Sequence, residues 1–205
     1  MEKFLKFAFV FIFSVFVVFN GSLANADPTV AIDPGASNPL VGEEFEINVV
    51  ITGEDIINCS GWDGRVLFVP EDLSFQGAGA GDFNPEGGMF VCSNPEPGKV
   101  TMIDYNMFGN TVTGQGVIAV VTFVPRRSGS TSLEPFNFTF TDPDATSIPV
   151  TLGASVEITI DPNPADLDFD DDVDGSDLAV FAEAYQAGTN PIPPETFAQH
   201  FGFSL

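Results

Sequence analysis

Between Asp27 and Ile160, apolar residues alternate with polar residues in short runs, and this period of two constrains the fold more than any other feature. The segment Glu44–Ile51 carries its phenylalanine, both isoleucines and a valine on one face, while the polar residues between them face away. Phe136, Phe138 and Phe140 alternate with polar residues in the same way. This pattern is typical of β-strands with one buried face. We therefore expect all three phenylalanines on the core side of a strand.

The whole region lacks the spacing of an amphipathic helix. Val117–Val124 is apolar on both parities, which favours a central strand covered on both sides. Gly, Pro, Asn and Asp residues separate the runs and supply the turns. About nine strands in a region of this length predict a mainly β, two-sheet sandwich with a sizeable core. The other expected strands are Thr29–Asp33, Gly64–Val69, Leu73–Gln76, Gly88–Cys92, Lys99–Met107, Ile148–Leu152 and Val156–Ile160.

The order of these segments carries a family resemblance across about residues 27–160. It begins with the VAIDP strand and GEEFEINVVITG, and a strand containing Trp62 follows. The later segments are LFVPEDLSFQGAGAGDF, PGKVTMIDYN, GQGVIAVVTFVP, SGSTSLEPFNFTF and VTLGASVEITI. Together they resemble the cohesin family. The resemblance implies a jelly-roll sandwich of the kind found in cellulosome scaffolds, which binds dockerin modules through one sheet face.

Acidic residues dominate the charge: 29 Asp and Glu stand against 6 Lys and Arg, for a net charge of −23. Such a chain repels phosphate backbones, which excludes most nucleic-acid binders. Because 44% of the residues are hydrophobic, we expect a folded core despite the charge. A single histidine and few lysines provide few candidate groups for acid–base catalysis. No pair of carboxylates stands out as a glycosidase site. We therefore expect a non-catalytic protein.

The first 26 residues have the three-part layout of a secretory signal peptide. Two lysines precede the apolar run Phe7–Phe19, and the segment ends in the small residues Ala24-Asn25-Ala26. An uncleaved anchor is the alternative, but the apolar run is short of the roughly 20 residues needed to span a bilayer. We therefore expect a secreted, extracellular protein that begins at Asp27 and has no membrane association after cleavage.

Cys59 and Cys92 are the only cysteines. In an exported chain, an even pair favours a disulfide over two free thiols. A bridge that closes a loop of this length would stabilise the fold by about 3–4 kcal/mol. We therefore predict a Cys59–Cys92 disulfide, with two buried free thiols as the alternative.

Eight aspartates lie within the 17 residues Asp161–Asp177, and this density of carboxylates predicts a bound cation. Calcium takes six to eight oxygen ligands, which a twelve-residue EF-hand loop supplies from positions 1, 3, 5, 7, 9 and 12. A loop that begins at Asp170 has Gly175 at position 6. However, it places Leu178 and Phe181 at positions 9 and 12, where oxygen ligands are needed.

A loop that begins at Asp166 places acids at both of these positions, and we prefer this register. Its position 6 is Asp171 instead of glycine, but aspartate tolerates the left-handed conformation better than most residues. The predicted calcium ligands are Asp166, Asp168, Asp170, the carbonyl of Asp172, Asp174 and Asp177.

Two helices are expected after the loop, at Asp177–Ala187 with Gly188 as its stop, and at Glu195–Phe201. The segments DVDGSDLAVFAEAY and FAQHFG resemble the dockerin family over about residues 161–205. This resemblance implies calcium and a protein partner. Dockerins carry two calcium loops, whereas the stretch Ala187–Pro194, where a second would lie, contains no carboxylate.

The leading hypothesis is a secreted, non-catalytic assembly protein of the cohesin/dockerin type, stabilised by Ca2+ in its tail, about residues 161–205. Its partners would be dockerin- or cohesin-bearing proteins, including a second copy of the chain. The alternative is a carbohydrate-binding module that brings its partners to polysaccharide. That function needs an exposed planar aromatic residue. Trp62 is the candidate for sugar stacking, although core packing is the interpretation we prefer for it.

Overall fold

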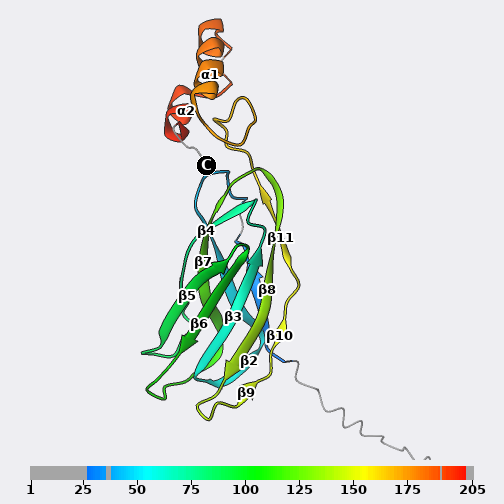
Figure 1. Cartoon of the computed structure of the whole chain (residues 1–205), viewed down its shortest axis with the longest axis vertical. Helices are drawn as coiled ribbons and strands as arrows, with labels where there is room; N and C mark the ends of the chain where they lie inside the picture. The colour runs from blue at the N-terminus through cyan, green and yellow to red at the C-terminus, as the bar shows by residue number, and fades with distance from the viewer. Residues whose placement is uncertain (1–26, 36–37, 190, 202–205) are drawn as a thin grey trace, which may run out of the picture.

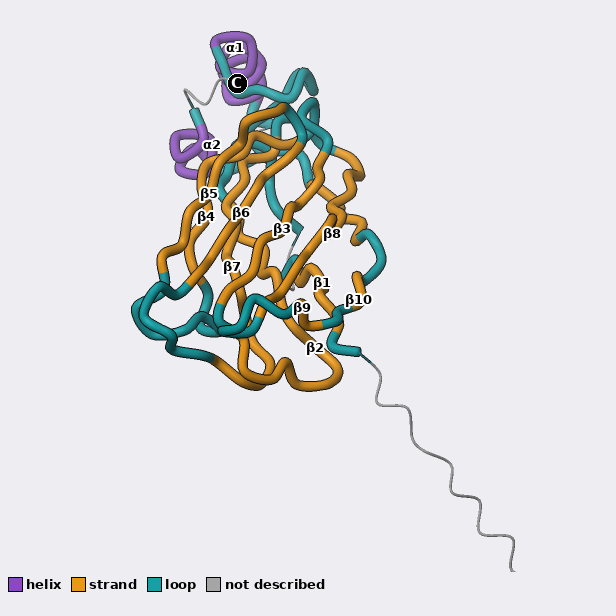
Figure 2. Tube along the Cα trace, turned by 60° about the horizontal axis from the view of Figure 1, so that its bottom comes forward, coloured by secondary structure: helices purple, strands orange, loops and turns teal. Residues whose placement is uncertain are grey.

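The computed structural model describes residues 27–35, 38–189 and 191–201, and it forms a two-sheet β-sandwich followed by two short helices (Figure 1). The predicted signal peptide lies outside these residues. No helix in the described ranges is long and apolar enough to cross a membrane. Both helices lie at one end of the sandwich, as Figure 2 shows.

The strands divide between two sheets. One has the order β10-β1-β2-β7-β4 and the other the order β11-β8-β3-β6-β5, with β9 paired to β8. The bounds are β1 (Thr29–Asp33), β2 (Phe45–Cys59), β3 (Gly61–Phe68), β4 (Leu73–Ala80), β5 (Met89–Glu96), β6 (Lys99–Tyr105), β7 (Val112–Pro125), β8 (Gly129–Thr141), β9 (Ser147–Ile148), β10 (Thr151–Leu152), β11 (Val156–Ile160), α1 (Gly175–Ala187) and α2 (Pro194–His200).

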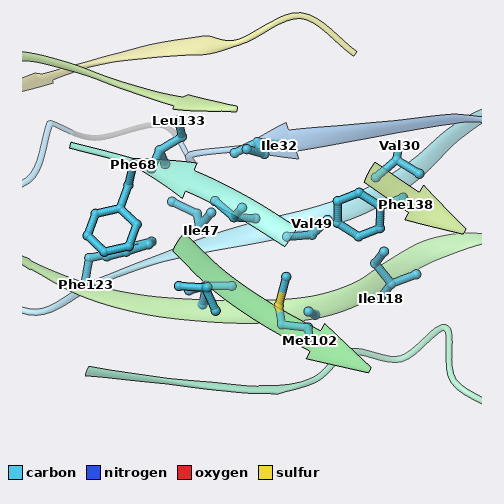
Figure 3. Packing of buried hydrophobic residues seen from close by; sticks show 14 of the residues in the cluster. Val30, Ile32, Ile47, Val49, Phe68, Met102, Ile118, Phe123, Leu133 and Phe138 are labelled. Atoms are coloured by element: carbon cyan, nitrogen blue, oxygen red, sulfur yellow. The ribbon is translucent and has the colours of Figure 1, made fainter. Parts of the chain in front are cut away.

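The core lies between the sheets and consists of the inward-facing residues, every second one along each strand (Figure 3). Ile47, Val49 and Ile51 are all buried, which confirms the alternation predicted for Glu44–Ile51. The rings of Phe68 and Phe123 pack across the layer with their centroids 5.1 Å apart. Each such side chain contributes roughly 1.5–3 kcal/mol when it is fully removed from water. The apolar alternation therefore accounts for both the strands and the core that holds them together.

One prediction from the alternation is wrong: Phe136 is 45% exposed and does not face the core with Phe138 and Phe140. The pairing of β3 with β8 shifts register here, and Asn137 has a φ of 50°. A β-bulge inserts one residue and reverses which parity faces inward. Before the bulge the odd-numbered residues of β8 are buried, and after it the even-numbered ones are.

The ring of Phe138 occupies the space above Gly64. A Cβ atom at Gly64 would lie 2.1 Å from the Cδ1 atom of that ring. We expect Gly64→Ala to lower the free energy of unfolding by about 1–3 kcal/mol, because the aromatic ring has to move. Urea unfolding measures this change. Gly77→Ala is the matched control, since nothing lies within 4 Å of its added Cβ, and equal losses in the two variants would contradict the packing described here.

The strand predicted at Ile148–Leu152 is two separate strands. β9 pairs with β8 in one sheet, whereas β10 pairs with β1 in the other. Pro149 lies between them and has no backbone N–H to donate to a ladder. The chain therefore crosses from one sheet to the other at this proline.

The predicted Cys59–Cys92 disulfide is wrong, because both thiols are free. Cys59 is the last residue of β2, whereas Cys92 lies in β5, the edge strand of the other sheet. Cys59 is fully buried, and this burial raises the pKa of its thiol to about 11.

Asp104 is a buried carboxyl group in β6. It is 1% exposed, and neither of its oxygens has a hydrogen-bond partner among the described residues. Burial raises its pKa, because removal from water disfavours the charged form. A pKa that is higher in the folded state means that this group's contribution to stability is lost as the pH rises through that pKa.

We expect wild-type protein to lose stability relative to Asp104→Asn as the pH rises from about 4 toward 8, because asparagine does not ionise there. Urea unfolding of both proteins across this range measures the difference. Parallel pH profiles would show that Asp104 does not titrate differently in the folded state.

Candidate metal site and binding face

The outer face of the β5-β6-β3-β8 sheet carries a group of exposed apolar side chains. We call the group Met89, Val91, Ile103, Tyr105 and Phe136 the apolar face; each is between 38% and 46% exposed. Four of its members are neighbours in the ladder, since Met89 pairs with Tyr105 and Val91 pairs with Ile103. The bulge turns Phe136 outward on the same face of the sheet, where it pairs with Arg65 of β3. Exposed apolar residues clustered in this way are typical of sites for protein partners.

Trp62 does not belong to this surface. It is 3% exposed, and its Nε1–H donates to Oδ1 of Asn84 at 3.0 Å. Its indole stacks on Phe138 and on Phe140, with ring centroids 6.1 and 6.3 Å away. The sugar-stacking role considered for Trp62 is therefore wrong, and its role is core packing.

At the end of the sandwich, the acidic loop folds around the carboxylate of Asp166. This side chain is 5% exposed and accepts hydrogen bonds from the backbone N–H groups of three residues that follow it. The donors are Phe169 at 2.7 Å, Asp170 at 3.2 Å and Asp171 at 3.0 Å. The local sequence thus turns the chain tightly around the residue at position 1 of the preferred register.

The carboxylate of Asp177 joins the far end of the loop to the beginning of α1. It is fully buried and accepts from the backbone N–H of Asp174 at 2.8 Å and of Asp168 at 3.2 Å. Asp174 is the N-cap of α1, and its side chain accepts from Ser176 N at 2.7 Å. It also accepts from the backbone N–H of Asp177, which completes a capping box with the Asp177 side chain. The capping box satisfies N–H groups that the first turn of a helix leaves free.

Two overlapping groups of carboxylates result. One oxygen from each of Asp166, Asp168 and Asp177 lies within 4.8 Å of the others, and the same holds for Asp172, Asp174 and Asp177. Asp170 belongs to neither group, and its Oδ1 accepts from Asp172 N at 3.3 Å. The two groups thus contain five of the six residues named from the spacing, with Asp177 common to both. Asp172 enters its group through a carboxylate oxygen, whereas the register assigned its backbone carbonyl.

The charges in this loop repel one another. The pKa values of Asp168 and Asp172 are both raised. The largest cause is partial removal from water, and the next is the negative charge of Asp170. Oδ1 of Asp172 is buried and has no hydrogen-bond partner among the described residues. No lysine or arginine occurs in the sequence from 161 to 205. An all-oxygen donor set with unbalanced negative charge fits a hard divalent cation such as calcium.

Backbone geometry also agrees with the register that begins at Asp166. Asp171, at position 6, has a φ of 72°, the left-handed conformation expected for it. In the competing register, Phe181 would occupy the last ligand position. Instead, Phe181 stacks on Phe197 of α2 with ring centroids 4.5 Å apart. The two helices thus share a small core of their own.

The predicted helices are confirmed. α1 begins two residues earlier than expected and is capped by Gly188, whose φ is 70°, and α2 is one residue earlier than expected at each end. α1 buries only Asp177 completely and leaves three apolar side chains exposed: Leu178 at 43%, Val180 at 39% and Tyr185 at 59%. In its exposed apolar character α1 differs from an ordinary surface helix, which turns its apolar stripe to the core.

Comparison with known proteins gives a fold and no family. No family model matches the chain, and no curated protein matches it. Among solved structures, the sixth cohesin of scaffoldin B from Acetivibrio cellulolyticus, in complex with a Cel5 dockerin mutant, is 17% identical with a TM-score of 0.58. The alignment covers 66% of this chain and 100% of that chain.

Two further structures agree. A non-cellulosomal cohesin from Archaeoglobus fulgidus is 18% identical over 66% of this chain and 92% of its own, with a TM-score of 0.55. The cohesin module of a family 33 glycoside hydrolase from Clostridium perfringens is 17% identical over 67% of this chain and 98% of its own, also with a TM-score of 0.55. The sandwich has the cohesin fold. At these identities the likeness establishes the architecture alone.

Within the cohesin fold, the tail and the far edge of the apolar face lie at opposite ends of the strands. β8 begins at Gly129, beside the acidic loop, and ends at Thr141, which pairs with Gly61. Gly61 pairs in turn with Tyr105 of the apolar face. Since a strand rises about 3.3 Å per residue, the length of β8 separates the two by roughly 40 Å. In this arrangement, α1 does not reach the far edge of the apolar face of its own chain.

Proposed function

We propose that this chain is a secreted, non-catalytic assembly protein that binds the helical module of a partner on its apolar face. The observation that carries the proposal is the cluster of exposed apolar side chains on one sheet of a cohesin-fold sandwich. A soluble protein rarely exposes such a cluster unless something covers it. The solved cohesins similar in fold include several in complex with dockerins, which supports a dockerin-bearing partner.

The tail is the second part of the proposal. We infer that Ca2+ binds among Asp166, Asp168, Asp170, Asp172, Asp174 and Asp177 and stabilises a dockerin-like segment over about residues 161–205. The buried carboxylates of Asp166 and Asp177 support this site, because a buried negative charge without a compensating cation is costly. The exposed apolar side chains of α1 would then bind a cohesin-bearing protein, and a second copy of this chain is one such protein.

Binding to the tail of a second copy would be head-to-tail. Contacts of this kind join different surfaces of the two molecules and generate open chains unless the geometry closes a ring. The roughly 40 Å between the tail and the far edge of the apolar face favours contact between chains over contact within one chain.

Immobilised full-length protein tests the proposal. We expect it to retain two-repeat dockerin modules, or its own soluble form, in calcium buffer, and not to sediment with insoluble cellulose or chitin. Retention on the polysaccharide without retention of any dockerin or of itself would favour the carbohydrate-binding alternative. The residue named for that alternative, Trp62, is buried, so the alternative is the less supported of the two.

A further inference from the structure

The described part of the tail contacts the sandwich at three separate places. The linker pairs with the segment before β2, where Val41 N donates to the carbonyl of Asp161 at 3.1 Å. In α2, Nδ1 of His200 lies 3.5 Å from Oε1 of Glu43. The third contact involves the acidic loop itself and is made by Asp171.

The carboxylate of Asp171 binds the turn between β7 and β8. Its Oδ1 accepts from both the backbone N–H and the hydroxyl of Ser128, each at 3.0 Å. Asp171 is at position 6 of the loop, where an EF-hand loop has an invariant glycine for the sharp turn. Here the backbone still adopts the left-handed conformation, with a φ of 72°. Keeping an aspartate at this strained position thus provides a contact that glycine could not make.

Asp171 also forms a hydrogen bond with a predicted calcium ligand. Asp171 N donates to Oδ2 of Asp166 at 3.0 Å. The carboxylate at position 1 of the loop is therefore joined to the sandwich through a single residue. An ion that fixes Asp166 would also fix the backbone from which the Asp171 side chain projects.

The turn that receives Asp171 is held in place by other contacts. Arg126 N donates to the carbonyl of Asp72 at 2.7 Å. The carboxylate of Asp72, which is 6% exposed, forms an ion pair with Arg127. Ser128 thus belongs to a fixed part of the sandwich and can anchor the loop.

We propose that Asp171 is a latch that couples calcium occupancy of the loop to attachment of the tail to the sandwich. The inference rests on the calcium site proposed above. With calcium bound, the loop holds the Asp171 carboxylate on Ser128, and the tail is fixed at one end of the sandwich. Without calcium, repulsion among the carboxylates loosens the loop, and the contact with Ser128 opens. Because such coupling is reciprocal, the contact with Ser128 also strengthens calcium binding.

Two substitutions in the full-length chain separate the latch from the ion site. Asp171→Gly keeps the left-handed backbone accessible and removes both hydrogen bonds to Ser128. Asp171→Asn is the matched control, since it retains an acceptor oxygen and also tolerates a positive φ. Calorimetry measures calcium binding, and amide hydrogen exchange at Ser128 reports the latch.

We expect calcium to slow exchange of the Ser128 amide by about 5–150-fold in wild type and in Asp171→Asn, the usual range for coupled sites. In Asp171→Gly, calcium still binds, but the Ser128 amide no longer responds. A wild-type protein that binds calcium without any change at Ser128 would overturn the latch and leave the calcium site standing. A protein that binds no calcium would overturn the calcium site, and the latch with it.

Discussion

Asp177→Ala is expected to abolish calcium binding and to unfold the first turn of α1. Asp177 is the only carboxylate common to both acidic groups, and it is fully buried. Its loss removes a central ligand and half of the capping box with Asp174, which by itself contributes about 1 kcal/mol. The backbone N–H groups that it satisfies would also be left without a partner, at about 1–3 kcal/mol for each one that stays buried.

Calorimetric titration with calcium and far-ultraviolet circular dichroism measure the two effects. In wild type we expect a loss of helical signal on chelation, because ligand binding and folding of a small metal segment are coupled. Asp177→Ala should resemble the chelated protein at all calcium concentrations. Glu183→Ala is the matched control, because it removes one acidic charge from an exposed position of the same helix. Unchanged calcium affinity in Asp177→Ala would show that the register is wrong.

Ile103→Lys is expected to weaken partner binding by about 30-fold or more. Ile103 lies within the apolar face, is 39% exposed, and is paired with Val91. A lysine there would place a charge within the apolar contact, and central residues of an interface commonly contribute 2 kcal/mol or more. Because the side chain is partly solvated, the fold should tolerate the change.

Ile57→Lys is the control for this prediction. Ile57 is an exposed isoleucine as well, at 62%, but it lies in β2 of the other sheet. Surface binding of a dockerin module to immobilised wild type and to both variants measures the effect. Equal binding by wild type and Ile103→Lys would place the contact elsewhere on the molecule.

Much of the fold follows from the sequence because burial in a strand has a strict period of two. Ile47, Val49 and Ile51 are buried as that period requires. The prediction is wrong for Phe136 because a bulge adds one residue, and nothing in the alternation marks where a bulge occurs. The predicted disulfide depended on two cysteines meeting in space, and the order of strands in a sheet does not follow from local patterns.

The candidate sites divide in the same way. The spacing of the acidic residues predicts the calcium site, since calcium ligands recur at fixed intervals in a short segment. The left-handed backbone of Asp171 was also predictable, because position 6 requires it. Its contact with Ser128 was not, since 43 residues separate the two. The apolar face could not be recognised either, because it combines residues of β5 and β6 with Phe136 of β8, which the bulge turns outward.

Sedimentation velocity of the full chain tests the central claim most directly. The experiment uses a series of protein concentrations in calcium, after chelation, and after addition of two-repeat dockerin modules. We predict heavier species in calcium, either of the chain with itself or with a dockerin module, and we predict that Ile103→Lys does not form them. If the chain remains monomeric at every concentration and forms no heavier species with any dockerin module, that result would contradict the proposal that it is an assembly protein.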